Sequence, residues 1–185
     1  PRVTTIKELS NGGEAEAICS EIRVFLQNGY SEVDIAIILY NQHQKYTTKG
    51  WKTYYYNLIP EIKRIFYREN WEEPSILISG KSDGATFGSR RGVTIVTIEG
   101  ALGLDFRAVI LAGLRPLGSY EKTQKLRDFK NLEPEKLSEK QEAFRKNVNL
   151  LYTGCTRAKD ELVIILSAQK GESIYMDLLC ESIGE

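Results

Sequence analysis

The sequence has 185 residues, of which 42% are hydrophobic and 27% charged, and this size and balance suit one globular domain with a packed core. Lysine plus arginine equals aspartate plus glutamate at 25 each, so the net field of the chain attracts no polyanion and any nucleic-acid binding has to rest on local contacts. No apolar stretch could span a bilayer and no basic region precedes an apolar signal core, so we expect no membrane contact and a cytoplasmic location.

The cysteine and histidine content excludes several kinds of site. Cys19, Cys155 and Cys180 are widely separated, and His43 is the only histidine. An odd number of scattered cysteines favours reduced thiols over a disulfide framework. A single histidine and no paired cysteine spacing come close to excluding a zinc site or a Ser-His-Asp triad, so the sequence predicts no metal site.

The first elements in chain order are a helix, a strand and a second helix. Glu14 to Gln27 carries apolar residues at helical spacing and stops at Asn28-Gly29, which predicts an amphipathic helix. Asp34 to Tyr40 is a near-continuous apolar run rich in β-branched isoleucine, typical of a strand that is buried on both faces. A helical stripe follows from Trp51 to Ile65, and Pro60 is expected to interrupt it.

The remaining pattern predicts further short buried strands and more helices. The strands are Ser75 to Ser79, Val93 to Ile98, Arg107 to Leu111 and Glu161 to Leu166, with a charged excursion or insertion over residues 120–140, a helical stripe that leads to Arg157, and a closing helix from Ser173 to Ile183. Buried strands separated by helices predict an α/β fold, a mostly parallel sheet with helices on both faces, in a single domain of residues 1–185.

One segment imitates the end of a phosphate-binding loop. Gly80-Lys81-Ser82 follows an apolar strand, but Ser75 stands where the loop requires its first glycine. The residues after it, Asp83-Gly84, open no helix whose N-terminus could hold a phosphate. We interpret the segment as an ordinary loop.

The stretch VTIVTIEGALGLDF, Val93 to Phe106, is a stronger candidate for a ligand site. A buried strand ends at Thr97, a turn with Gly103 follows, and Asp105 precedes the next strand. Because ligands bind beyond the carboxyl ends of parallel strands, the Thr97 hydroxyl could meet a phosphate oxygen and the Asp105 carboxylate could accept from a ribose hydroxyl. A helix cap and an ordinary turn remain the alternative.

A second candidate is LLYTGCTRAKDEL, Leu150 to Leu162. Arg157 ends an apolar helical run there, and an arginine at a helix end often neutralises the terminal carbonyl groups. The small residues before it, from Thr153 to Thr156, let a backbone come close, and the planar fork of arginine suits phosphate. The residues alone therefore indicate a phosphate-binding arginine without its own phosphate loop.

Together, TIEGALGLDF and LLYTGCTRAKDEL resemble motifs V and VI of superfamily 1 helicases of the UvrD/Rep type, and IAIILYN resembles motif IV. The three occur in family order over residues 35–166. In that family they belong to the second of two RecA-like domains, while the first carries the Walker A loop, the Walker B acidic pair and motif III. None of those is found in this sequence. The resemblance implies a C-terminal RecA-like domain that lacks its own Walker A loop, within a longer polypeptide.

The resemblance assigns ligands residue by residue. Arg157 matches the motif VI arginine, the catalytic residue that reaches the γ-phosphate across the interdomain cleft. Asp105, with Gly103 in the same turn, stands at the motif V glutamate that binds the ribose. The implied cofactor is ATP with Mg²⁺, held mainly by the N-terminal RecA-like domain of the same polypeptide, so we expect the isolated chain to hydrolyse no ATP.

The implied nucleic-acid partner is single-stranded DNA. Thr97 matches a threonine that contacts the strand backbone, and Arg90 and Arg91 are further candidate contacts.

Three departures from the family pattern support an alternative. Asn41 replaces the motif IV arginine, and Glu99 and Leu102 replace the usual histidine and lysine of motif V. They favour a degenerate, noncatalytic RecA-like module that binds partners within a DNA repair or defence complex. A stand-alone nucleotide-binding α/β protein is a further class, which the missing phosphate loop disfavours.

Overall fold

A computed structural model of the chain describes residues 2–8, 13–40, 50–77, 91–114 and 149–166, with positions 142 and 146. The elements in chain order are β1 (Arg2–Glu8), α1 (Glu14–Gln27), the 3-10 helix η1 (Glu32–Asp34), β2 (Ile35–Leu39), α2 (Gly50–Glu69), β3 (Ser75–Leu77), β4 (Thr94–Thr97), β5 (Phe106–Leu114) and β6 (Ala158–Leu166). A further helix, residues 149–155, leads into β6. None of the described helices is long and apolar enough to cross a membrane.

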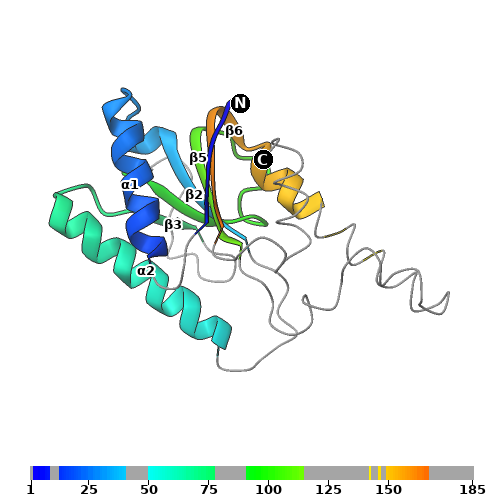
Figure 1. Ribbon diagram of the computed structural model, residues 1–185, viewed down its shortest axis with the longest axis horizontal. Helices are drawn as coiled ribbons and strands as arrows, with labels where there is room; N and C mark the ends of the chain where they lie inside the picture. Colours follow the sequence, from blue (N-terminus) through cyan, green and yellow to red (C-terminus); the bar gives the residue numbers. More distant parts are fainter. Residues whose placement is uncertain are drawn as a thin grey trace.

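Within the described residues, six strands form one sheet in the order β1-β6-β5-β2-β4-β3 (Figure 1). All five neighbouring pairs are parallel. Because parallel strands need a crossover after each strand, both faces of such a sheet are covered, and its central strands read as continuous apolar runs. Every residue of β2 is fully buried. The predicted α/β fold with a parallel sheet is confirmed.

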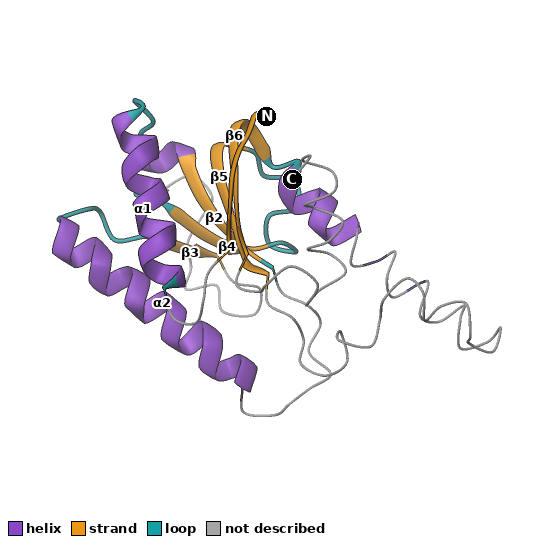
Figure 2. Ribbon diagram, in the orientation of Figure 1, coloured by secondary structure: helices purple, strands orange, loops and turns teal. Residues whose placement is uncertain are grey.

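Helices cover the two faces of the sheet separately. In Figure 2, α1 and α2 lie on one side and the helix at residues 149–155 on the other. Successive residues of β2 point to opposite faces. Ile37 therefore belongs to the core beneath α1 and α2, whereas Ile38 belongs to the core with Leu151.

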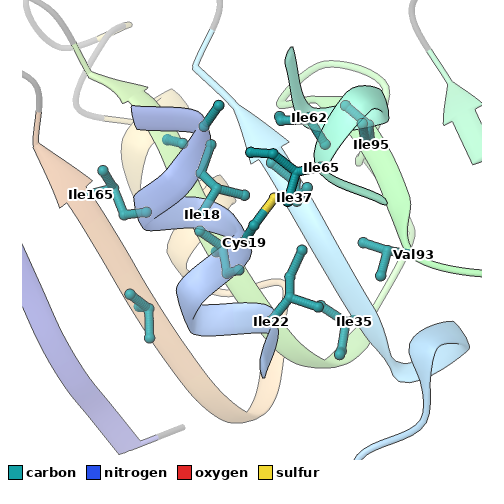
Figure 3. Packing of buried hydrophobic residues seen from close by; sticks show 14 of the residues in the cluster. Ile18, Cys19, Ile22, Ile35, Ile37, Ile62, Ile65, Val93, Ile95 and Ile165 are labelled. Atoms are coloured by element: carbon teal, nitrogen blue, oxygen red, sulfur yellow. The ribbon is translucent and has the colours of Figure 1, made fainter. Parts of the chain in front are cut away.

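The core beneath α1 and α2 is built from branched aliphatic side chains. Figure 3 shows Ile18 and Ile22 of α1 and Ile65 of α2 packed over β2, whose Ile37 belongs to the same cluster. All four are at most 1% exposed. This core fixes the central strands from which the candidate sites extend.

The expectation that Pro60 interrupts the second helix is wrong. α2 runs unbroken through Pro60, although an interior proline removes one backbone donor and costs about 3 kcal/mol. Beyond it, Ile62, Ile65 and Phe66 are at most 1% exposed, and each such burial contributes about 1.5–3 kcal/mol. Packing after the proline therefore outweighs its local cost.

Three predicted segments lie outside the described residues: the loop at Gly80-Lys81-Ser82, the charged excursion at 120–140 and the closing helix at Ser173 to Ile183.

The strand β1 has no counterpart among the predicted elements. It pairs with β6 at one border of the sheet.

Candidate nucleotide site at the amino edge of the sheet

Sheet pairing brings Asp105 and Arg157 together, although they are far apart in the sequence. Asp105 directly precedes β5 and Arg157 directly precedes β6. These strands are parallel neighbours in which Phe106 lies opposite Ala158, and the Phe106 N–H donates to the Arg157 carbonyl at 2.9 Å. Both residues therefore lie where β5 and β6 begin, at the amino edge of the sheet.

The Arg157 guanidinium is held by its own surroundings. Its Nε donates to the Thr153 carbonyl at 3.2 Å, Nη1 to the Leu104 carbonyl at 3.4 Å, and Nη2 to Thr156 Oγ1 at 3.3 Å. Its Nη1 also lies 3.4 Å from Asp105 Oδ1. The side chain thus closes the end of the helix at 149–155 and ties it to the turn before β5.

A third charged residue completes this cluster. Lys159 Nζ lies 4.0 Å from Asp105 Oδ2, so the Asp105 carboxylate stands between two cations. The side chains of Asp105 and Lys159 are 49% and 59% exposed, whereas that of Arg157 is 22% exposed. Two cations and one carboxylate leave one net positive charge at the surface, which suits an anionic ligand.

Lys159 was not among the residues that the sequence indicated. The spacing indicates it, because Lys159 lies two positions after Arg157 and residues two apart in an extended chain point to the same face. It was missed because the predicted strand began at Glu161, whereas β6 begins at Ala158.

The small residues before Arg157 let the helix end approach the sheet closely. A Cβ on Gly154 would lie 3.1 Å from Leu111 Cδ1 and 3.2 Å from Ile98 Cδ1. The Thr153 hydroxyl donates to the Asn149 carbonyl at 2.8 Å. The helix end therefore sits directly on the sheet, which sets the position of the arginine that follows.

Gly103 contributes backbone conformation to the site. Its φ is +79°, in the left-handed region, while an added Cβ would meet no heavy atom within 4 Å. The position therefore favours glycine for its backbone and not for space. The turn that it makes leads the chain back to Asp105.

The expectation that Thr97 and Asp105 both lie beyond the carboxyl ends of strands is wrong for Asp105, which lies at the amino end of β5. Thr97 pairs with Leu39, and Leu39 with Ala112, which lies six residues beyond Phe106 along β5. At roughly 3.3 Å per residue, Thr97 and the start of β5 are about 20 Å apart along the sheet. The reason is the parallel crossover, since the chain that leaves β4 at its carboxyl end must return to the opposite edge before β5.

At the carboxyl edge, the Thr97 hydroxyl is used inside its own turn. It accepts a hydrogen bond from the Gly100 N–H at 3.2 Å, and Thr97 is 3% exposed. Gly100 is closely packed, because a Cβ there would lie 3.0 Å from Val96 Cγ2. Thr97 therefore shapes the turn that follows β4.

The candidate DNA contacts are not grouped. Arg91 is exposed, but it precedes β4 and therefore lies at the amino edge, away from Thr97. Its carbonyl accepts from Ser75 Oγ at 2.8 Å. Arg90 lies outside the described residues.

The departures from the motif pattern have different surroundings. Both carboxylate oxygens of Glu99 are buried, whereas Leu102 is 63% exposed. The Glu99 carboxylate is therefore not available to repel a phosphate at the surface. Asn41 lies outside the described residues.

No protein-family model matches the sequence, and no curated protein matches it as a relative. Among solved structures, the chain is similar to the C-terminal domain of a possible DNA helicase from Lactobacillus plantarum WCFS1, with 17% sequence identity and a TM-score of 0.43, covering 93% of this chain and 78% of that one.

Proposed function

We propose that the chain is the C-terminal RecA-like motor domain of a UvrD-like, superfamily 1, ATP-dependent DNA helicase. ATP with Mg²⁺ binds between this domain and a Walker-bearing N-terminal domain of the same polypeptide. Closure of the cleft brings Arg157 to the γ-phosphate, and hydrolysis reopens the cleft and moves the two domains along single-stranded DNA.

One observation carries the proposal. The residues that match the nucleotide ligands of motifs V and VI, Asp105 and Arg157, meet within 3.4 Å at one exposed edge of a parallel sheet. Convergence of two distant motifs on one surface cluster with a net positive charge supports a shared ligand, and a polyphosphate nucleotide fits that charge.

The roles follow from the chemistry of each group. The fork of Arg157 neutralises charge that develops on the transferred phosphoryl group, and the Asp105 carboxylate accepts from the ribose hydroxyls. Mg²⁺ and the phosphate cradle come from the partner domain. At the other edge, the turn that Thr97 shapes is the proposed contact to the DNA backbone.

The test is substitution of Arg157 in the full-length polypeptide. Arg157→Ala should lower DNA-stimulated ATPase turnover by roughly 10³-fold or more, as loss of a cross-cleft arginine does. Arg157→Lys should rescue little, because an ammonium group lacks the bidentate fork. Arg107→Ala is the matched control, since Arg107 also lies at the amino edge but is paired with Asp160 at 2.8 Å.

The second candidate is the noncatalytic module. The hydrogen bonds of Arg157 to Thr153, Leu104 and Thr156 favour it, because a purely structural arginine would make the same contacts. In that case both variants keep wild-type turnover, and the stability lost in Arg157→Ala, at most about 1 kcal/mol, is largely restored by lysine.

A further inference from the structure

As long as the Asp105–Arg157 ion pair is formed, the two residues cannot bind the two ends of one nucleotide at the same time. Under the proposed function, on which this inference rests, Asp105 holds the ribose and Arg157 the γ-phosphate. The α- and β-phosphates separate these two parts of ATP. With Nη1 only 3.4 Å from Oδ1, the guanidinium and the carboxylate are too close to serve both ends of the ligand.

We propose that the Asp105–Arg157 pair is a latch that the ribose opens. When the ribose hydroxyls donate to Asp105, they take over the carboxylate oxygen that faces Arg157, and the guanidinium is released toward the γ-phosphate. Lys159 is the positioning residue of this exchange. It stays beside the other carboxylate oxygen, so Asp105 keeps a cationic neighbour after Arg157 has left.

The surroundings of the pair suit such an exchange. The Asp105 side chain is 49% exposed and that of Lys159 59%, so water can solvate both charges during the exchange. The Arg157 side chain is 22% exposed, but its partner Asp105 is open to water, and ion pairs with an exposed partner contribute a factor of about five or less in an equilibrium constant. By contrast, the backbone beneath them is fixed by the pairing of β5 and β6. The Arg157 side chain gives up its donations to Thr153, Leu104 and Thr156 as well, and the phosphate oxygens accept from it in their place.

The test uses the full-length polypeptide and ligands that separate ribose from phosphate. Affinities of wild type and Asp105→Asn are measured by calorimetry for the imido analogue of ATP, its 2′,3′-dideoxy form and inorganic tripolyphosphate. Asp105→Asn should lose the preference for the analogue with ribose hydroxyls. It should also bind tripolyphosphate about two- to fivefold more tightly, because Arg157 is no longer held by a carboxylate.

Two further variants sharpen the test. Asp160→Asn removes the other aspartate–arginine pair at this edge, which joins Asp160 to Arg107, and should change none of the three affinities. Lys159→Gln should weaken binding of the imido analogue, and Lys159→Arg should restore it. Unchanged melting temperatures show that the variants are folded.

The outcomes separate the latch from the proposed function. If wild type shows no preference for ribose hydroxyls, Asp105 does not bind the ribose, and the proposed role and the latch both fail. If Asp105→Asn loses that preference but binds tripolyphosphate no more tightly than wild type, the ribose contact stands and the latch is wrong.

Discussion

Arg157 stabilises its own helix end in the absence of any ligand. Its donors to the Thr153 and Leu104 carbonyls join the last turn of the helix at 149–155 to the chain before β5. These contacts give Arg157 a structural role in addition to the ligand-binding role proposed for it, so a loss of activity on substitution has to be compared with a loss of stability. Lysine separates the two, because its charge suits a helix end but its geometry does not suit a phosphate fork.

Gly154→Ala should destabilise the chain by about 1–3 kcal/mol, the usual range for overpacking. The added methyl would press on Leu111 and Ile98, which are at most 1% exposed and cannot move aside. The better helix propensity of alanine offsets about 1 kcal/mol at most. Urea denaturation measures the difference, and Gly13→Ala, where a methyl meets no heavy atom within 4 Å, should cost less. Equal costs would show that the close approach of the helix does not matter.

The two described cysteines should make the fold sensitive to alkaline pH. Burial raises the pKa of the Cys19 thiol from 9 to about 12 and that of Cys155 to about 11. The unfolded chain therefore releases these protons near pH 9 while the folded chain retains them, so stability falls as the pH rises from 9 toward 11. The melting temperature should fall less steeply over this interval in the Cys19→Ala, Cys155→Ala double variant. Parallel curves would contradict this.

At the scale of elements, the sequence predicted the buried interior well and the ends poorly. The helix at Glu14–Gln27 has the predicted bounds, and each predicted strand within the described residues is present. These elements are set by local apolar patterns. The pairing strand β1 and the early start of β6 were missed, because partners across the sheet stabilise polar residues such as Lys159 in a strand.

Glu69→Gln should destabilise the α1–α2 pair at neutral pH and not in acid. Glu69 Oε1 accepts from Arg23 of α1 at 2.9 Å. Hydrogen bonding from Arg23, supported by Arg68, lowers the pKa of Glu69 below its ordinary 4.5. This stabilisation is present above pH 4.5 and is lost as the pH falls through the lowered pKa. The variant should therefore melt below wild type at pH 7, with the gap closing on acidification toward pH 2.

A control on the same helix isolates the ion pair. Glu61 is exposed on α2, and Glu61→Gln should leave the melting temperature unchanged at both pH values. A gap between wild type and Glu69→Gln that persists in acid would assign the effect to packing and not to charge.

At the scale of the whole molecule, the sheet places Thr97 and Asp105 at opposite edges, although both belong to one short stretch of sequence. Thr97 and Asp105 are eight positions apart in the sequence, yet the crossover from β4 to β5 places them at opposite edges. Adjacency in sequence gave no information about this, because only the strand register shows which edge each residue occupies. The pairing of Asp105 with Arg157 likewise depends on β5 and β6 being neighbours, which no local pattern specifies.

The separation of the edges leads to the last prediction, on binding of labelled single-stranded DNA by the nucleotide-free full-length polypeptide between 50 and 200 mM salt. Thr97→Val should weaken binding by about three- to tenfold, because it removes the hydrogen bond from the Gly100 N–H that fixes the DNA-binding turn, and Thr97→Ser should retain most of the affinity. Arg91 and Arg157 lie at the amino edge, so alanine at either should leave the affinity and its salt dependence unchanged. A phosphate contact by Arg91 would instead reduce the salt slope by about 0.7, since each neutralised phosphate of a single strand contributes that amount. A reduced slope in Arg91→Ala would mean that DNA follows the amino edge, and the assignment of Thr97 to the DNA contact would then fail.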